Sequence, residues 1–124
     1  MDVAAYQKRI KDWVIRTFGE ALFTDRRERA ARVVEEAIEL AQAEGLNLLE
    51  VDLISMRVYS RPAGEVSQEA AGLSVCLLAY ADTAGMDLDA VTLTEIERIE
   101  SVPVEKFRRK QAEKAAAGTA RAAE

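Results

Sequence analysis

The chain has 124 residues, of which 49% are hydrophobic and 31% are charged, and its net charge is −5. These values fit one helical globular domain rather than a disordered chain, and the acidic balance offers no broad electrostatic footprint for nucleic acid. Histidine is absent, a single cysteine excludes an intrachain disulfide, and no apolar stretch resembles a signal sequence or a membrane span, so we expect a cytoplasmic protein.

Apolar residues recur at helical spacing along most of the chain and predict an all-α fold. Asp25-x-x-Glu28 and Asn47-x-x-Glu50 have the spacing of capping boxes at helix starts. Helices are expected over residues 3–17, 26–44, 48–59, 65–84, 90–100 and 104–114. We expect a four-to-five-helix bundle, completed by dimerisation because so short a chain has little room for a deep active site.

The domain boundaries follow from composition. Residues 1–114 are predicted to form a single helical domain, and the alanine-rich residues 115–124 to form a disordered tail. The segment 65–84 is apolar on most sides, which predicts the central and most buried helix. Glu65 and Glu69 lie one turn apart on it, and carboxylates on a buried helix need a compensating cation or hydrogen-bond donor.

A second set of carboxylates, Glu35, Glu36 and Glu39, is called the acidic cluster below. Glu36 and Glu39 are expected to project together from the edge of an apolar helix face, and Glu35 to point further toward solvent. Taken alone, such a cluster is more typical of a solvated helix face. The second pair favours a shared site, because acidic pairs on neighbouring antiparallel helices can converge on one ion. Four carboxylates without imidazole or clustered thiolate select a hard cation, Mg²⁺ or Mn²⁺, over zinc.

These residues resemble the motifs of the MazG-like all-α nucleoside triphosphate pyrophosphohydrolases, in which one helix carries EExxE and a later helix carries ExxD. The acidic cluster matches the first motif. In the second motif, Glu69 matches but Gly72 stands where the family has aspartate. The stretch Arg61-Pro62-Ala63-Gly64-Glu65 is similar to the small phage and proteobacterial branch of the family.

The resemblance implies hydrolysis of a nucleoside triphosphate, with ribose or deoxyribose, between its α and β phosphates on a homodimer or homotetramer. The products are the monophosphate and pyrophosphate. It implies that Glu36, Glu39 and Glu69 bind Mg²⁺, and Glu65 is the candidate for the fourth ligand. Glu35 and Glu36 are the candidate catalytic residues, with Glu35 orienting or deprotonating the attacking water.

Phosphate groups also need cationic partners. The candidates are Arg61, Lys106, Arg109 and Lys110, although ordinary surface solubility explains these side chains as well. Because Gly72 removes one expected ligand, a non-catalytic member of the family, binding a nucleotide or a partner protein as a helical oligomer, stays open as the alternative. No membrane or nucleic-acid partner is expected.

Overall fold

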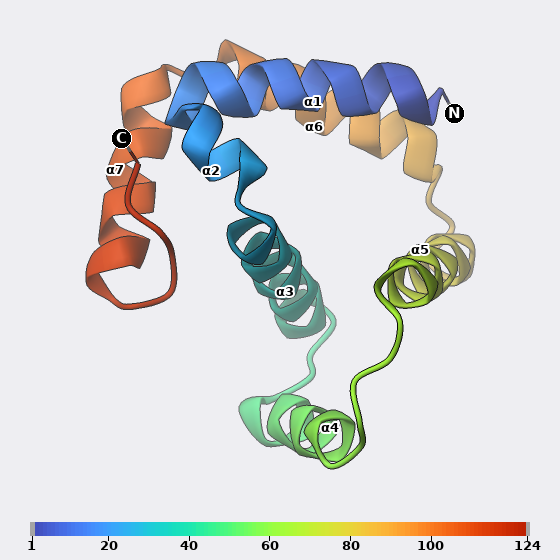
Figure 1. The fold of residues 1–124 in the computed structure, drawn as a ribbon. Helices are drawn as coiled ribbons and strands as arrows, with labels where there is room; N and C mark the ends of the chain where they lie inside the picture. Colours follow the sequence, from blue (N-terminus) through green and yellow to red (C-terminus); the bar gives the residue numbers. More distant parts are fainter. Residues whose placement is uncertain (1, 124) are drawn as a thin grey trace. The chain divides into compact units, whose positions relative to one another are not determined.

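A computed structural model describes residues 2–123, and over this range the protein is helical and contains no strand (Figure 1). The all-α prediction is confirmed. The helices are α1 (Val3–Phe18), α2 (Glu20–Thr24), α3 (Arg26–Ala43), α4 (Leu48–Tyr59), α5 (Val66–Thr83), α6 (Leu88–Ser101) and α7 (Val104–Ala116). None of the helices in this range is both long and apolar enough to cross a membrane.

The helix starts agree with the capping signals of the sequence. Asp2 accepts a hydrogen bond of 3.0 Å from the amide of Ala5 and caps α1. Asn47 and Glu50 form both hydrogen bonds of a capping box, at 2.9 and 3.2 Å, so α4 begins where the sequence predicts. Gly45 follows the end of α3 with a φ of 89°, a left-handed conformation that glycine adopts without strain.

The short helix α2 was not predicted. Gly19, with a φ of 95°, separates it from α1, and Leu22 at its centre is fully buried. Five residues are too few to show a hydrophobic period, so the pattern could not reveal this helix. At the other end of the chain, α7 continues to Ala116, and hydrogen bonds hold the following residues on α3, where the sequence predicted a disordered tail.

The chain divides into two compact units. The first comprises Met1–Ala37 and Thr92–Glu124, and the second comprises Ile38–Val91. The division falls within α3 and within α6, so each of these helices contributes residues to both units. The prediction of one domain over residues 1–114 stays a prediction.

The first unit has an apolar core that contains an aromatic cluster. Trp13 contacts the rings of Phe18 and Phe107 edge to face, with centroid distances of 5.7 and 5.1 Å. Its indole nitrogen donates a hydrogen bond of 3.2 Å to the carbonyl oxygen of Ile99, which joins α1 to α6 (Figure 1). The buried apolar side chains of this unit are Val14, Leu22 and Ile96.

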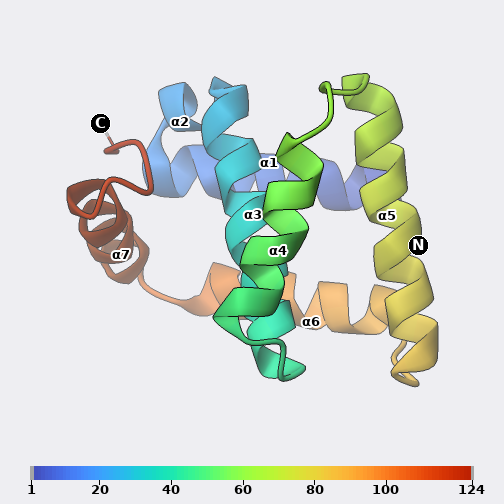
Figure 2. The same ribbon diagram turned by 90° about the horizontal axis from the view of Figure 1, so that it is seen from below.

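The second unit lacks such a core, and here one prediction is wrong. The segment 65–84 was expected to form the most buried helix, but Ala81 is the one buried residue of α5, and α4 has none. Figure 2 shows α4 and α5 as separate helices joined by an irregular segment. An apolar helix is buried only where other elements cover it, and within the second unit most residues of α5 are exposed.

Candidate metal centre

Helix α3 brings the three carboxylates of the acidic cluster together. One oxygen from each of Glu35, Glu36 and Glu39 lies within 4.8 Å of the others. They belong to successive turns of one continuous helix, where residues four apart share a face. Two like charges about 4 Å apart repel by about 1 kcal/mol in water and about 4 kcal/mol near a protein surface. A cation bound by the cluster would relieve this repulsion.

The relative exposure of these glutamates differs from the prediction. Glu35 was expected to point furthest toward solvent, but only 25% of its side chain is exposed, whereas Glu36 and Glu39 are exposed. The cause is a pair of cationic neighbours: Lys114 Nζ lies 2.6 Å from Glu35 Oε1, and Arg32 Nη1 lies 3.3 Å from Glu35 Oε2. Both carboxylate oxygens of Glu35 are therefore held by the protein itself.

A further cation, Arg98 on α6, acts on the same cluster. Its hydrogen bond to Glu95 raises the pKa of the Arg98 guanidinium, and the negative charge of Glu36 adds to this effect. Arg98 thus stays charged and contributes a positive field at Glu36. In the acidic cluster, Glu35 is held by two ion pairs and is partly buried, whereas the side chains of Glu36 and Glu39 are exposed.

Glu65 lies at the N-terminus of α5 and caps this helix. Its carboxylate accepts hydrogen bonds from the amides of Ser67 and Gln68, at 3.1 and 2.9 Å, and from the Ser67 hydroxyl. The hydroxyl of Ser67, followed by the amides of Gln68 and Ser67, holds the pKa of Glu65 below its usual range. The predicted metal ligand is therefore an ionised cap that already satisfies both of its oxygens.

Glu69, in the first turn of α5, lies against the glycine of the preceding loop. A Cβ atom on Gly64 would collide with the Glu69 carboxylate, so the missing side chain at position 64 creates the space that Glu69 occupies. Gly72 is different, since a Cβ atom there would meet nothing within 4 Å. An aspartate at position 72 would fit the described chain.

The structure brings together the three carboxylates of the acidic cluster, and a shared site with Glu65 and Glu69 stays a prediction. Over residues 2–123, the group of three or more possible metal ligands consists of the acidic cluster and does not include Glu65 or Glu69. The four predicted phosphate-binding cations are all exposed: Arg61 belongs to the second unit, and Lys106, Arg109 and Lys110 belong to the first.

Sequence reasoning missed the residues that support the cluster. Glu28 was treated as part of a capping box, yet its side chain is only 1% exposed and pairs with Arg29 and Arg32. Lys114 was not assigned any role, although it contacts Glu35. The contacts of Gln111 with Glu28 and of Lys114 with Glu35 leave no signal in the sequence, because these residues lie 83 and 79 positions apart along the chain.

The donor set of the cluster fits one class of metal ion. Carboxylate oxygens alone suit Mg²⁺ or Mn²⁺, whereas zinc and copper prefer imidazole and thiolate. Comparisons of the chain with protein-family models, with curated proteins and with solved structures find no match. The resemblance to MazG-like pyrophosphohydrolases thus rests on the chain's own motifs and stays a prediction.

We predict that Glu65→Gln lowers the stability of the protein to urea at neutral pH, because the ionised carboxylate accepts the capping hydrogen bonds. Since folding lowers the pKa of Glu65, this contribution is present above the ordinary glutamate value of about 4.3. It is lost as the pH falls through the lower value of the folded protein. Urea unfolding of wild type and variant near neutral pH and in acid measures the change.

Glu69→Gln is the matched control, since it makes the same chemical change in the same helical turn without removing a capping bond. A stability difference for Glu65→Gln that persists in full in strong acid would contradict capping by an ionised carboxylate.

Proposed function

We propose that the protein is a Mg²⁺-dependent nucleotide pyrophosphohydrolase that cleaves a nucleoside triphosphate to the monophosphate and pyrophosphate, and that Mn²⁺ can replace Mg²⁺. The observation that carries the proposal is the acidic cluster of α3, whose three carboxylates lie within 4.8 Å of one another in the spacing of the EExxE motif. We place this activity in the cytoplasm, where its substrates are available.

In this proposal Glu36 and Glu39 bind the ion from α3, and Glu69 binds it from α5, with Glu65 as a further candidate. Bound Mg²⁺ would neutralise the triphosphate and polarise the reacting phosphorus. Glu35 orients the attacking water and accepts its proton. The water oxygen forms a bond to the α phosphorus as its proton passes to Glu35, the bond to the α,β-bridging oxygen breaks, and pyrophosphate leaves.

The cationic candidates would contact the phosphates. Arg61, Lys106, Arg109 and Lys110 are exposed, and their charges suit the triphosphate, which carries several negative charges. These cations would position the substrate and compensate the negative charge of the leaving pyrophosphate. The carboxylates would have a different role, which is to bind the metal ion.

A second candidate function follows from Gly72. Since open space surrounds this position and a metal ligand would fit there, its absence favours a family member that binds a nucleotide or a protein without turning it over. Such a protein would form the helical oligomer but would not hydrolyse the nucleotide. The two candidates differ in one measurable property, the release of pyrophosphate.

We expect the purified protein to release pyrophosphate from at least one member of a panel of ribonucleoside and deoxyribonucleoside triphosphates with Mg²⁺ or Mn²⁺. Glu36→Gln should lower kcat/KM at least about 100-fold, the loss typical of removing one charge-stabilising group from an active site. Glu97→Gln, an exposed glutamate on α6, is the control and should leave kcat/KM unchanged.

Gly72→Asp separates a weak enzyme from a non-catalytic relative. The new carboxylate completes the family's second motif, so we expect a higher rate and a lower Mg²⁺ requirement, whereas the neutral Gly72→Asn should show neither. Absence of turnover in both the wild type and Gly72→Asp would contradict the pyrophosphohydrolase and favour the binding protein.

We further propose that α4 and α5 form the interface of a homo-oligomer. Leu49, Leu53 and Met56 lie on one face of α4 and are 56–67% exposed, and Leu73 and Leu77 on α5 are 40–47% exposed. The two helices contain 12 and 18 residues, and a standard interface uses about 20–30 residues from each partner. A second copy is the occupant that matches this area, because it supplies an apolar surface of the same size and shape.

Light scattering coupled to size-exclusion chromatography should therefore give the mass of two or four chains. Leu53→Glu is expected to shift the protein toward the monomer, because association would bury a charge. Val3→Glu changes a similarly exposed apolar residue of α1 and should keep the oligomer, since 53% of Val3 and 56% of Leu53 is exposed. A wild-type protein that is monomeric at all concentrations would contradict this interface.

A further inference from the structure

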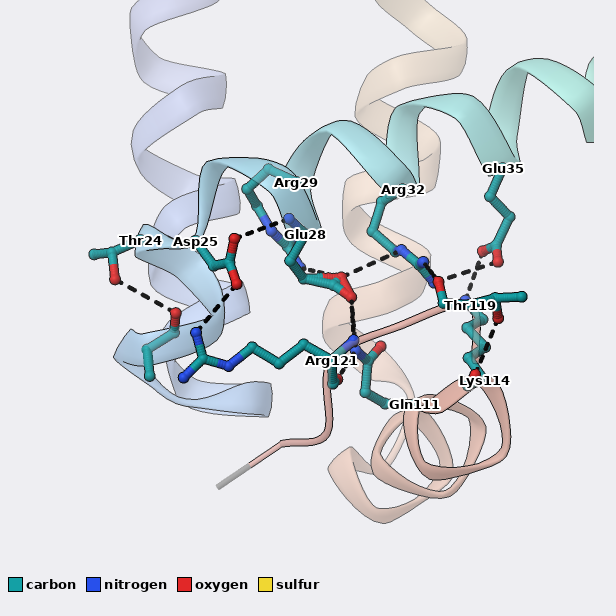
Figure 3. A network of polar contacts seen from close by, with 11 residues as sticks. Thr24, Asp25, Glu28, Arg29, Arg32, Glu35, Gln111, Lys114, Thr119 and Arg121 are labelled. Carbon is teal, nitrogen blue, oxygen red and sulfur yellow. Dashed lines mark hydrogen bonds and ion pairs between the residues drawn. The ribbon is translucent and has the colours of Figure 1, made fainter. Parts of the chain in front are cut away.

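The end of the chain is attached to α3 by a set of polar contacts (Figure 3). After α7 the backbone reverses at Gly118, whose φ is 79°. Arg32 then donates a hydrogen bond to the carbonyl oxygen of Thr119. The amide of Arg121 donates to Glu28 Oε1 at 2.9 Å, and its guanidinium lies 3.1 Å from Asp25. We call residues 117–121 the latch.

The anchor of the latch is the buried carboxylate of Glu28, whose side chain is 1% exposed. Its Oε1 atom accepts hydrogen bonds from the Arg121 amide and from the Gln111 side chain, the second at 3.2 Å. Its Oε2 atom lies 3.4 Å from Arg32 and 3.7 Å from Arg29 and makes ion pairs without a hydrogen bond. A buried carboxylate requires such donors. If the latch undocked, Glu28 would lose the hydrogen bond from the Arg121 amide while its side chain stayed largely buried.

The latch also contacts two residues that pair with Glu35. Thr119 is hydrogen-bonded through its amide and its hydroxyl to the carbonyl oxygen of Lys114, at 2.9 and 3.0 Å. Lys114 in turn places its ammonium 2.6 Å from Glu35. Arg32 bridges the two regions directly, because it contacts Thr119 in the latch and Glu35 in the acidic cluster. Arg32 and Lys114 therefore contact both the latch and the acidic cluster.

We propose that the latch holds Lys114 as an internal counter-ion of the acidic cluster, so that docking of the latch and binding of a divalent cation oppose each other. The proposal rests on the proposed function for its metal site and concerns the regulation of that site. A divalent ion bound beside Glu35 repels the ammonium of Lys114 and the guanidinium of Arg32. By thermodynamic linkage, a docked latch weakens the metal and a bound metal loosens the latch by the same factor.

Titration with Mn²⁺ alone, without nucleotide, tests the first half of this coupling. Lys114→Met should bind Mn²⁺ about 5-fold more tightly than wild type, at the lower end of typical coupling factors. The difference should shrink as salt screens the charges. Lys114→Arg keeps the cation and should restore wild-type affinity. Lys8→Met alters the net charge equally at an exposed ion pair on α1 and should have no effect.

Limited trypsin digestion tests the second half and does not depend on activity. In the metal-free protein, both the amide and the carbonyl oxygen of Arg121 are hydrogen-bonded, so cleavage after this residue should be slow. Mn²⁺ should accelerate the cleavage in wild type, as followed by mass spectrometry, but not in Glu36→Gln/Glu39→Gln.

Each remaining outcome is decisive. Cleavage after Arg121 in the metal-free protein at the rate of an unstructured peptide would overturn the latch, whatever the metal does. Equal or weaker Mn²⁺ affinity in Lys114→Met would overturn the coupling while leaving the metal site intact. Slow cleavage together with no Mn²⁺ binding by any variant would contradict the proposed metal site and, with it, the coupling. The docked latch itself would stand in that case.

Discussion

The carboxylate of Glu28 lies inside the first unit with 1% of its side chain exposed, and much of the polar structure around α3 satisfies it. Removing one partner of a buried ion pair typically costs about 3–5 kcal/mol, so these contacts constrain the fold strongly. Arg32 approaches from the same helix, whereas Gln111 and the amide of Arg121 come from α7 and from the segment beyond it. One buried charge thereby fixes the N-terminal half of α3 to the end of the chain and gives Glu35 a defined environment.

The longer helices could be predicted because their signals are local. Asn47 and Glu50 form the predicted capping box, and the predicted span of α4 is the observed one. The proximity of Glu36 and Glu39 was predictable for the same reason, since residues three apart on a helix lie on one face, whereas Glu35 was expected to point elsewhere. Glu65 shows the limit of such reasoning: a boundary shift of one residue turned a predicted helical ligand into an N-cap, which uses its oxygens differently.

What could not be predicted depends on partners distant in sequence or outside the chain. The spacing of Asp25 and Glu28 suggested a capping box, and Asp25 does accept the Glu28 amide, but the Glu28 side chain turns inward toward residues 111 and 121. Burial of α5 was inferred from its apolar composition. This composition indicates that an apolar neighbour covers the helix, but it does not indicate whether the neighbour belongs to the same chain or to another one. The same composition is consistent with a helix that is covered only when a second chain associates.

Mn²⁺ binding measured by electron paramagnetic resonance is the direct test of a site for a hard divalent cation on α3. The wild-type protein should bind Mn²⁺, and the Glu36→Gln/Glu39→Gln variant should bind it at least about 10-fold more weakly while unfolding at the same or a higher urea concentration, because the substitutions relieve charge repulsion. Equal Mn²⁺ affinity in the two proteins, or no binding by the wild type at millimolar Mn²⁺, would show that Glu36 and Glu39 do not bind a divalent ion.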